Sequence, residues 1–323
     1  MNDIKKIGVL TSGGDSPGMN AAIRAVVRSA IYENKEVFGI FRGYRGLING
    51  EIEQMHSHSV SNIIQRGGTI LKSARSMGFM EYEGRQKAHE NLIKHEIDAL
   101  IAIGGDGTFT GANIFMDEFD YPIIGLPGTI DNDLYGTDFT IGYDTAINTV
   151  MEAVDKIRDT ADSHERLFII EVMGRDAGFI ALRSGIATGA EKILIPESTT
   201  YIENLFRLLQ QDRKKQKTSG IIIVAEGDDS GGAIEVAKKI NEKFEDFETR
   251  ISILGHIQRG GSPTAMDRFR ASIMGYAAVQ AILEGQRGIM VGIVDKDIAY
   301  TPFEKSIKHH QSIDPVLLEI SRI

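Results

Sequence analysis

The sequence predicts an α/β fold of two doubly wound, Rossmann-like domains, each a three-layer αβα sandwich, with a cleft between them. Short apolar runs rich in Ile, Val and Leu recur along the 323-residue chain, and glycine or proline follows each of them. Most of these runs lead into a segment with helical periodicity, and this alternation indicates parallel sheets with helices on both faces. There are more such units than one compact sheet holds, so we expect two domains.

The apolar runs are continuous rather than alternating, as expected of strands that are covered on both faces. The predicted strands cover residues 6–10, 37–41, 98–105, 122–128, 167–174, 192–196, 220–227, 251–255 and 288–294. The predicted helices cover residues 19–32, 84–95, 143–161, 202–216, 233–244 and 266–285. In such folds ligands bind at the carboxyl ends of the strands, and most glycines of the chain cluster there.

Composition excludes several classes of function. The chain has 36 basic and 45 acidic residues, so its net charge of −9 repels nucleic acid and anionic membranes, and neither is expected as a partner. It has no cysteine, which excludes disulfides and thiolate chemistry. Its apolar runs are too short for a transmembrane helix, and its first residues lack a signal-peptide core. We therefore expect a cytoplasmic protein.

The first glycine cluster, "SGGDSPGMN", follows the strand predicted over residues 6–10. Gly13 and Gly18 have the spacing of a P-loop, but Met19 and Asn20 stand where that motif has Lys and Ser or Thr. It is therefore not a Walker site. Its amides and the positive end of the following helix are still suited to a phosphate. The alternative is an ordinary tight connection from strand to helix.

The second cluster, "GGDGT", places Asp106 among glycines after the most apolar strand. Gly105, Gly107 and Gly111 resemble a dinucleotide fingerprint with one residue too many, which is weak support. A carboxylate that faces phosphate repels it unless a divalent cation lies between them. Mg²⁺ fits, because it uses one or two carboxylates and leaves its other positions to phosphate oxygens and water. A simple turn is the alternative.

The stretch "LPGTIDNDLYGTD" sets Asp131 and Asp133 beyond another strand. Asp and Asn often form turns by bonding their own backbone, but Gly128 already supplies the turn here. Phosphoryl transfer to a hydroxyl needs a carboxylate beside the attacking oxygen, and Asp131 suits that role. Asp133 is a candidate to support the water shell of the metal.

Cationic side chains recur at strand boundaries or beside glycines. Each alone reads as a solvated surface charge, but together they exceed what one transferring phosphoryl group needs, so a second phosphate on the acceptor is implied. Glu226, at the end of a predicted strand, is suited to bind sugar hydroxyls. The cations are Arg75, Arg166, Arg175, Arg250, His256 and Arg259.

Six motifs follow one another along the chain: "SGGDSPGMNAAIR", "GGDGT", "PGTIDND", "RDTADSHER", "EVMGRDAG" and "ILGHIQRGGSP". In this order they resemble the bacterial ATP-dependent 6-phosphofructokinase family, and the likeness runs from about Lys5 to about Gly292. "GGDGT" alone is shared with NAD kinases and lipid kinases, which is one alternative. A non-catalytic two-domain sugar-phosphate sensor is another.

The resemblance implies that MgATP phosphorylates the 1-hydroxyl of fructose 6-phosphate, the committed step of glycolysis, between two domains of a homotetramer. It implies an ATP-binding domain over residues 1–140 and 257–308, and a fructose 6-phosphate domain over residues 141–256 and 309–323. The implied catalytic residues are Gly14, Arg75, Thr129, Asp131 and Arg175. The implied ATP site comprises Gly14, Arg75, Ser76, Gly105, Asp106, Gly107 and Thr108, with Asp106 as the Mg²⁺ ligand.

The implied sugar-phosphate site comprises Thr129, Ile130, Asp131, Met173, Gly174, Arg175, Glu226, His256, Ile257, Gln258 and Arg259, with Arg166 and Arg250 resembling arginines lent by a neighbouring subunit. Relatives that use pyrophosphate carry Asp at Gly107 and Lys at Gly128, so both glycines favour ATP.

An effector site for ADP or phosphoenolpyruvate is reproduced in part. Ser57 stands where relatives commonly have Arg, and Thr218 and Ser219 replace a Lys-His pair, so a weakened response is expected. The matching residues are Arg24, Arg28, Arg158, Gly189, Glu191, Lys215 and Lys217.

Overall fold

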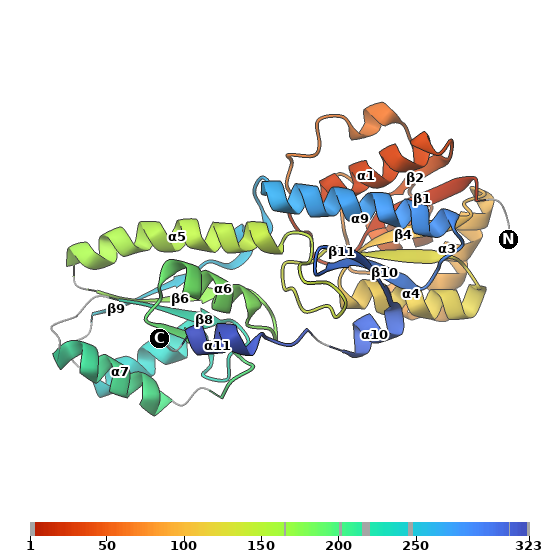
Figure 1. The fold of residues 1–323 in the computed structure, drawn as a ribbon. Coiled ribbons are helices and arrows are strands. Elements are labelled where there is room, and N and C mark those ends of the chain that lie inside the picture. The colour runs from red at the N-terminus through yellow and green to blue at the C-terminus, as the bar shows by residue number, and fades with distance from the viewer. Residues whose placement is uncertain are drawn as a thin grey trace. The chain divides into compact units, whose positions relative to one another are not determined.

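A computed structural model describes residues 4–164, 166–199, 202–214, 220–244, 248–309 and 311–321. The chain divides into two compact units, each with its own sheet. Unit 1 comprises Met1–Ile130, Leu134–Thr145 and Arg259–Gln311, and unit 2 comprises Asp131–Asp133, Ala146–Gln258 and Ser312–Ile323. Figure 1 shows the elements of both units.

The sheet of unit 1 has seven strands in the order β11-β10-β5-β4-β1-β2-β3. Its five central strands are parallel, and the two edge strands, β3 and β11, are antiparallel to their neighbours. The strands are β1 (Lys6–Thr11), β2 (Glu36–Ile40), β3 (Ile52–Met55), β4 (Ala99–Gly104), β5 (Ile123–Pro127), β10 (Ile289–Val294) and β11 (Asp297–Pro302).

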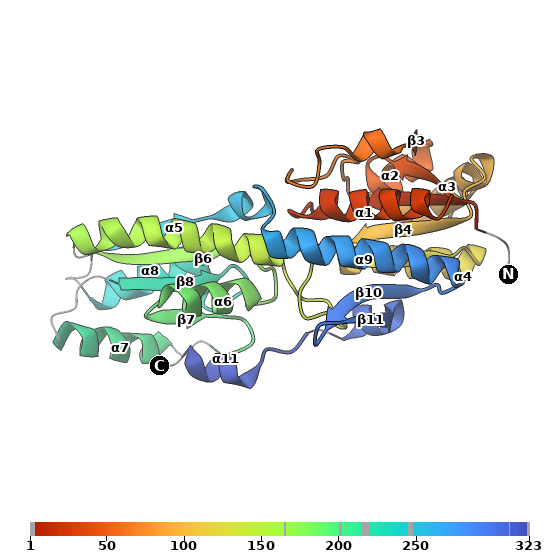
Figure 2. The same cartoon turned by 45° about the horizontal axis from the view of Figure 1, so that its top comes forward.

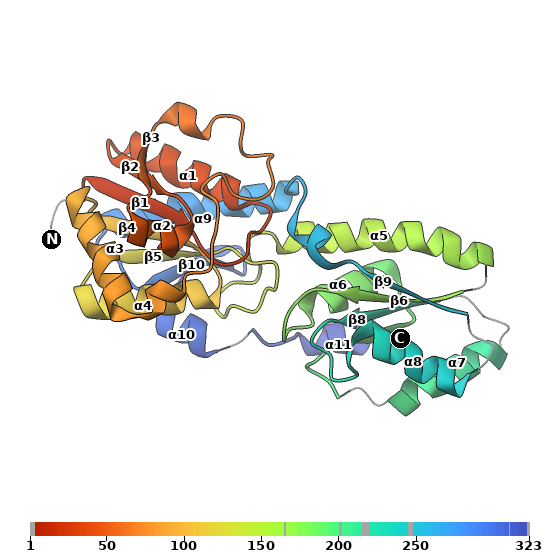
Figure 3. The ribbon, with the colours of Figure 1, turned by 180° about the vertical axis from the view of Figure 1, so that it is seen from behind.

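Helices cover both faces of this sheet. On one face, α1 (Met19–Tyr32) and α9 (Ala265–Leu283) lie side by side (Figure 2). On the other face lie α2 (Gly43–Asn49), α3 (Tyr82–Lys94), α4 (Asp106–Phe119) and α10 (Phe303–Lys308), which are labelled in Figure 3. The short 3-10 helices η1 (Ser57–Val60) and η2 (Met77–Met80) lie in the connection between β3 and α3.

Alternate residues of the central strands enter two separate cores. In β4, Ile101 and Ile103 pack with α1 and α9, whereas Leu100 and Ala102 pack with the aromatic side chains of α4 and the buried face of α3. Side chains of a strand point to opposite faces in turn, so burial on both faces requires the uninterrupted apolar run seen in the sequence.

The sheet of unit 2 has four parallel strands in the order β7-β8-β6-β9. They are β6 (Leu167–Val172), β7 (Lys192–Leu194), β8 (Gly220–Ala225) and β9 (Thr249–Ile253). α6 (Phe179–Thr188) packs on β7 and β8, and α7 (Ile202–Lys214) and α8 (Gly232–Lys243) share a core with the sheet. α5 (Tyr143–His164) begins in unit 1 and continues in unit 2, and α11 (Pro315–Ile320) packs on α6.

The α/β fold class is confirmed, and each strand predicted from the sequence is present as a parallel strand. Two predictions need correction. The sheet of unit 1 is mixed, because β3 and β11 add antiparallel edges. Asp106–Phe119, for which no helix is predicted from the sequence, forms α4, so the GGDGT motif contains the first turn of a helix. Of the helices in the described part of the chain, none has the length and apolarity needed to span a membrane.

Candidate active site

Three glycine-containing connections lie together at one edge of the sheet of unit 1. Parallel pairing aligns Thr11 with Ile103 and Gly104 with Pro127, so β1, β4 and β5 end side by side. Beyond the strands, the Ser12 N–H donates to the Ile103 carbonyl at 2.9 Å, and the Gly128 N–H donates to the Gly104 carbonyl at 3.0 Å. The sequence prediction that these connections share the carboxyl edge is therefore correct within unit 1.

Close packing requires glycine at this edge. A Cβ atom on Gly104 would lie 2.3 Å from Thr108 Oγ1 and 2.6 Å from the Ser12 carbonyl oxygen, too close for any side chain. Gly13 has a φ of +82°, in the left-handed region that favours glycine. A Cβ on Gly107, in contrast, would meet nothing within 4 Å. Space above the first turn of α4 is therefore open.

Asp106 is the first residue of α4 and is exposed. The amino end of a helix carries unsatisfied N–H groups and partial positive charge, which suit a carboxylate or a phosphate. Thr108, in the same turn, is buried, and its carbonyl accepts the Tyr44 hydroxyl at 2.6 Å. In this turn Thr108 is therefore held in the interior, while the Asp106 carboxylate lies on the exposed side.

The segment that carries Arg75 and Ser76 is tied to the same edge. The Ser73 hydroxyl donates to the Gly13 carbonyl, and Ser76 immediately precedes η2. Phe79 of η2 stacks on Tyr44, with ring centroids 3.9 Å apart. Arg75 is exposed and, within the described residues, makes no hydrogen bond or ion pair. Its guanidinium is therefore available to an anionic ligand.

Arg259 lies against the first glycine loop in unit 1. Its Nη1 donates to the Asp15 carbonyl at 3.3 Å, and a Cβ on Gly14 would approach that nitrogen to 2.5 Å. Glycine at position 14 therefore admits the guanidinium. The family resemblance implies that Arg259 belongs to the sugar-phosphate site and Gly14 to the ATP site, and the two residues are in contact here.

The stretch Thr129–Asp131 continues from the end of β5, and all three residues are buried. Gly128 pairs with Ile141 in an isolated parallel bridge, which holds the backbone just before Thr129. A Cβ on Gly105 would lie 3.7 Å from Thr129 Cβ, so the second and third glycine connections are in contact range. The boundary between the two units falls between Ile130 and Asp131.

Asp131 pairs with Arg175 in unit 2. Arg175 Nε lies 3.4 Å from Asp131 Oδ2, and the Asp131 side chain is 2% exposed whereas that of Arg175 is 49% exposed. The positive charge compensates a carboxylate that would otherwise be costly to bury. An ionised carboxylate of this kind can accept a proton from an alcohol placed beside it.

The predicted sugar-site residues meet at the carboxyl ends of β6, β8 and β9 in unit 2. Glu226 Oε1 accepts the backbone N–H groups of Gly174 at 3.2 Å and of Arg175 at 2.8 Å. Gln258 is fully buried, and its Oε1 accepts the Met173 N–H at 3.2 Å. These bonds fix the turn after β6, where Gly174 and Arg175 both have positive φ.

His256 and Ile257 lie in the 3-10 helix η3 (Gly255–Arg259), and both side chains are exposed. Their neighbour Gln258 is buried. η3 therefore directs two side chains outward from a fixed base after β9.

Arg166 and Arg250 do not join this group. Arg166 precedes β6 and Arg250 is the second residue of β9, so both lie at the amino ends of strands whose carboxyl ends carry Met173 and His256. Arg166 Nε lies 3.2 Å from Glu248 Oε1, and Arg250 also pairs with Glu248. The Arg166 guanidinium beside it, with the nearby positive charge of Arg250, lowers the pKa of Glu248. The cations predicted at strand boundaries therefore lie at both edges of the sheet, and not only at the carboxyl edge.

Two of the predicted effector residues, Arg158 and Gly189, are in contact in unit 2, and Glu191 lies two positions further along the chain. Arg158 Nη2 donates to the carbonyls of Thr188 at 2.6 Å and of Gly189 at 3.2 Å, and the Glu191 carboxylate accepts the Ile221 N–H. Arg24 and Arg28 belong to α1 of unit 1, and Ser57 begins η1. Lys215, Lys217, Thr218 and Ser219 lie outside the described residues.

Sequence reasoning did not identify Ser73 and Tyr44, which connect the Arg75 segment to the glycine connections. Neither residue belongs to a recognisable motif. Their partners, Gly13 and Thr108, are 60 and 64 positions away along the chain, so only the fold reveals the contacts.

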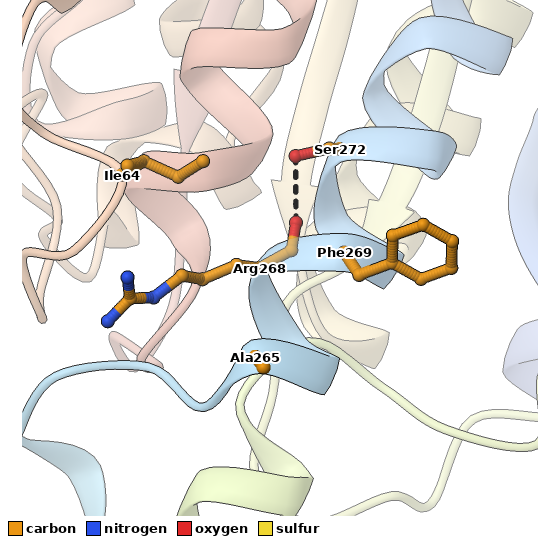
Figure 4. A pocket seen from close by; sticks show the side chains of 5 residues that line it. All are labelled: Ile64, Ala265, Arg268, Phe269 and Ser272. Atoms are coloured by element: carbon orange, nitrogen blue, oxygen red, sulfur yellow. Dashed lines mark hydrogen bonds between the residues drawn. The ribbon is translucent and has the colours of Figure 1, made fainter.

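A hollow of about 530 Å³ on the surface of unit 1 lies along α9, and Ile64, Ala265, Arg268, Phe269 and Ser272 line it (Figure 4). The Ser272 hydroxyl donates to the Arg268 carbonyl at 2.7 Å. None of the residues predicted for the site lines this hollow.

Residues 6–282 match the family model described as phosphofructokinase. The chain is 57% identical over 320 residues to "ATP-dependent 6-phosphofructokinase 2" of Bacteroides thetaiotaomicron, covering 99% of this chain and 98% of that protein. It is 53% identical to "ATP-dependent 6-phosphofructokinase 1" of Thermus thermophilus, covering 99% of each. Phosphofructokinase from Saccharomyces cerevisiae has a similar structure, with a TM-score of 0.89 and 42% identity over 94% of this chain, which spans 45% of the yeast chain.

Proposed function

The chain belongs to the phosphofructokinase family, and we propose that it transfers the γ-phosphoryl group of ATP to the 1-hydroxyl of fructose 6-phosphate, which gives fructose 1,6-bisphosphate. The names of relatives more than half identical to it support ATP as the donor. The observation that carries the proposal is the buried Asp131 carboxylate beside Arg175, in a stretch that begins at Thr129 next to the Gly105 turn.

We assign the donor to unit 1. The open space above Gly107, the amino end of α4 and the exposed Arg75 support binding of the ATP phosphates there, with Gly14 and Ser76 at the same edge. Asp106 provides a hard oxygen ligand. Mg²⁺ would take this one carboxylate and fill its other positions with phosphate oxygens and water. Bound Mg²⁺ would neutralise charge on the phosphates.

We assign the acceptor to unit 2, where Met173, Gly174, Arg175 and Glu226 meet, with His256 beside them on η3. Asp131 accepts the proton of the attacking hydroxyl, and Arg175 holds the carboxylate and the transferring phosphoryl group. Arg259 contacts the Gly14 loop and supplies a further positive charge. The proposed domains are residues 1–140 with 257–308, and residues 141–256 with 309–323.

We propose that Arg166 and Arg250 serve the site of a neighbouring subunit in a homotetramer. Their place at the amino ends of β6 and β9, away from Met173 and Glu226, supports this role. We also propose a cytoplasmic enzyme with a weak response to ADP or phosphoenolpyruvate. The contact of Arg158 with the Gly189 carbonyl supports an effector site there, and the substitutions at Ser57 and Ser219 reduce its positive charge.

The role of Asp131 is tested by replacing it with Ala. We expect turnover to fall at least about a hundredfold, with fructose 6-phosphate binding within about threefold of wild type, because a proton acceptor acts mainly in the transition state. Asp98→Asn is the control, because Asp98 precedes β4 at the opposite edge of the sheet, where its carboxylate accepts the N–H groups of Lys5 and Lys6. Steady-state kinetics and calorimetric titration measure the two quantities. Retention of most activity by Asp131→Ala would refute the assignment.

A further inference from the structure

A buried carboxylate, Asp267, joins the start of α5 to the start of α9 within unit 1. Its Oδ1 accepts the Gly142 N–H at 2.9 Å, and its Oδ2 accepts the Thr145 N–H at 2.8 Å and the Thr145 hydroxyl at 2.5 Å. The side chain is fully buried, and burial raises its pKa to about 6. At neutral pH the carboxylate is therefore ionised, and it accepts three hydrogen bonds from the segment Gly142–Thr145.

Two hydroxyl groups close a ring around this carboxylate. Thr145 Oγ1 also accepts the Thr264 N–H at 3.0 Å. Thr264 caps α9 by accepting the Asp267 N–H at 3.2 Å, and its hydroxyl donates to Asp144 Oδ2 at 2.6 Å. Each hydroxyl thus donates one hydrogen bond and accepts one, so its orientation is fixed.

The anchored segment is in direct contact with two of the glycine connections. Ile141, the residue before Gly142, pairs with Gly128 and donates its N–H to the Pro127 carbonyl at 2.8 Å. Its carbonyl accepts the Ser16 hydroxyl at 2.7 Å. Ser16 belongs to the Gly13–Gly18 loop, and Gly128 directly precedes Thr129. Ile141 is therefore a bridge between the two connections.

We propose that Asp267 is a positioning residue: by holding Gly142 and Thr145 it fixes Ile141, and through Ile141 it sets the spacing between the Gly13–Gly18 loop and the Gly128–Thr129 turn. As far as reaction rate is concerned, this inference rests on the proposed function. The alternative is that Asp267 only stabilises the fold. The two roles differ, because positioning acts on the chemical step, whereas stabilisation acts equally on all of unit 1.

Asp267→Asn separates these roles, because the groups around the carboxylate are hydrogen-bond donors. An amide keeps the size but places its own N–H₂ against a donor, so at least one bond is lost and the segment shifts. Displacements of about 1 Å at a reacting centre cost up to about a hundredfold in rate. We expect kcat to fall at least about tenfold, with the KM for fructose 6-phosphate changed less than about threefold.

A second pair of variants keeps the test valid if Asp267→Asn does not fold. Thr145→Val keeps the shape of the side chain and removes its hydroxyl, whereas Thr145→Ser keeps the hydroxyl. We expect Thr145→Val to lower kcat in the same way and Thr145→Ser to stay within about twofold of wild type. Asp98→Asn again serves as control, since its carboxylate accepts the Lys5 and Lys6 N–H groups at the far end of the sheet.

Hydrogen–deuterium exchange followed by mass spectrometry tests the inference without the reaction. We expect faster exchange in Asp267→Asn and Thr145→Val, confined to peptides that contain Gly128 and Ile141–Thr145, and no such change in Asp98→Asn. Lack of kinase activity in the wild type would overturn the proposed function. The exchange experiment would still test whether Asp267 positions Ile141, because it does not depend on activity. Unchanged exchange, or faster exchange spread over all of unit 1, would overturn the positioning role.

Discussion

Two glycines of one motif are glycine for different reasons. Gly104 has no room for a Cβ, because Thr108 and the Ser12 carbonyl lie against it. Gly107 has open space around it and lies in the exposed first turn of α4. Packing therefore requires the first glycine, while the second keeps a volume free for the proposed ATP phosphates.

This difference predicts the effect of a charge at Gly107. Gly107→Asp should fold as the wild type does and raise the KM for ATP at least about tenfold, because its carboxylate would face the phosphates without a clash. Gly107→Ala is the control: it adds a Cβ without charge, and we expect ATP kinetics within about threefold of wild type and a small gain in helix stability. Equal loss of ATP affinity in both variants would show that space, not charge, matters there.

At the residue scale, the sequence identifies candidate functional residues, but it does not reveal the side chains or backbone groups that contact them. The motif around Asp131 identifies a candidate base, but its ion pair with Arg175 joins residues that no pattern relates. In the same way, the Thr264-x-x-Asp267 pattern is a recognisable helix cap, yet the bonds of Asp267 to Gly142 and Thr145 span 125 and 122 positions. Long-range polar contacts depend on how the elements pack, so sequence patterns do not contain them.

At the scale of elements, apolar continuity predicted the strands that are covered on both faces. β3 (Ile52–Met55) and β11 (Asp297–Pro302) were missed because they are edge strands with few buried residues and charged positions. α4 was missed because Gly107, Gly111 and Asp106 are poor helix formers. Its core-facing Phe109, Ala112 and Phe115 outweigh those propensities once the sheet is present.

Asp267, whose hydrogen bonds connect the start of α9 to the start of α5, predicts a specific pH dependence of stability. Burial, assisted by the nearby negative charge of Asp144, raises the pKa of Asp267 from 3.8 to about 6 in the folded state. A raised folded pKa means that the contribution to stability is fully present below about pH 4 and is lost as the pH rises through about 6. The free energy of unfolding of the wild type, relative to Asp267→Asn, should therefore fall by about 3 kcal/mol across this window.

Urea unfolding of both proteins at a series of pH values measures this difference. Because both proteins share all other titratable groups, their contributions to the pH dependence cancel in the comparison. One of these groups is Glu118, whose pKa is lowered chiefly by its hydrogen bond with Arg85. If the difference in unfolding free energy between the two proteins stays constant from about pH 4 to about pH 7, the pKa of Asp267 is not raised in the folded state.

At the scale of the whole molecule, the sequence predicted two α/β domains, and the chain forms two such units. Each unit is built from segments that are not contiguous in the sequence. Arg259–Gln311 belongs to unit 1, and Asp131–Asp133 belongs to unit 2. Composition does not mark these crossings, because no low-complexity linker separates the segments. Family likeness, not residue pattern, suggested the order of the segments.

The proposed sharing of arginines predicts complementation between two inactive variants. Arg166→Ala and Asp131→Ala should each lose most activity with fructose 6-phosphate when expressed alone. In a co-expressed mixture, a site that takes its base from one subunit and its arginine from the next should work, so about a quarter of sites should recover. The mixture is purified through two different tags and its kcat per site is measured. If Arg166 acts within its own chain, the mixture stays inactive.

The most direct test of the whole account compares phosphoryl donors and acceptors on the purified wild-type protein. Release of ADP is followed with ATP alone, and with ATP plus fructose 6-phosphate or plus NAD, and product formation is followed with pyrophosphate in place of ATP. We predict rapid ADP release only with ATP and fructose 6-phosphate together, with one fructose 1,6-bisphosphate formed for each ADP. Transfer to NAD, dependence on pyrophosphate, or binding of fructose 6-phosphate without ATP consumption would contradict it.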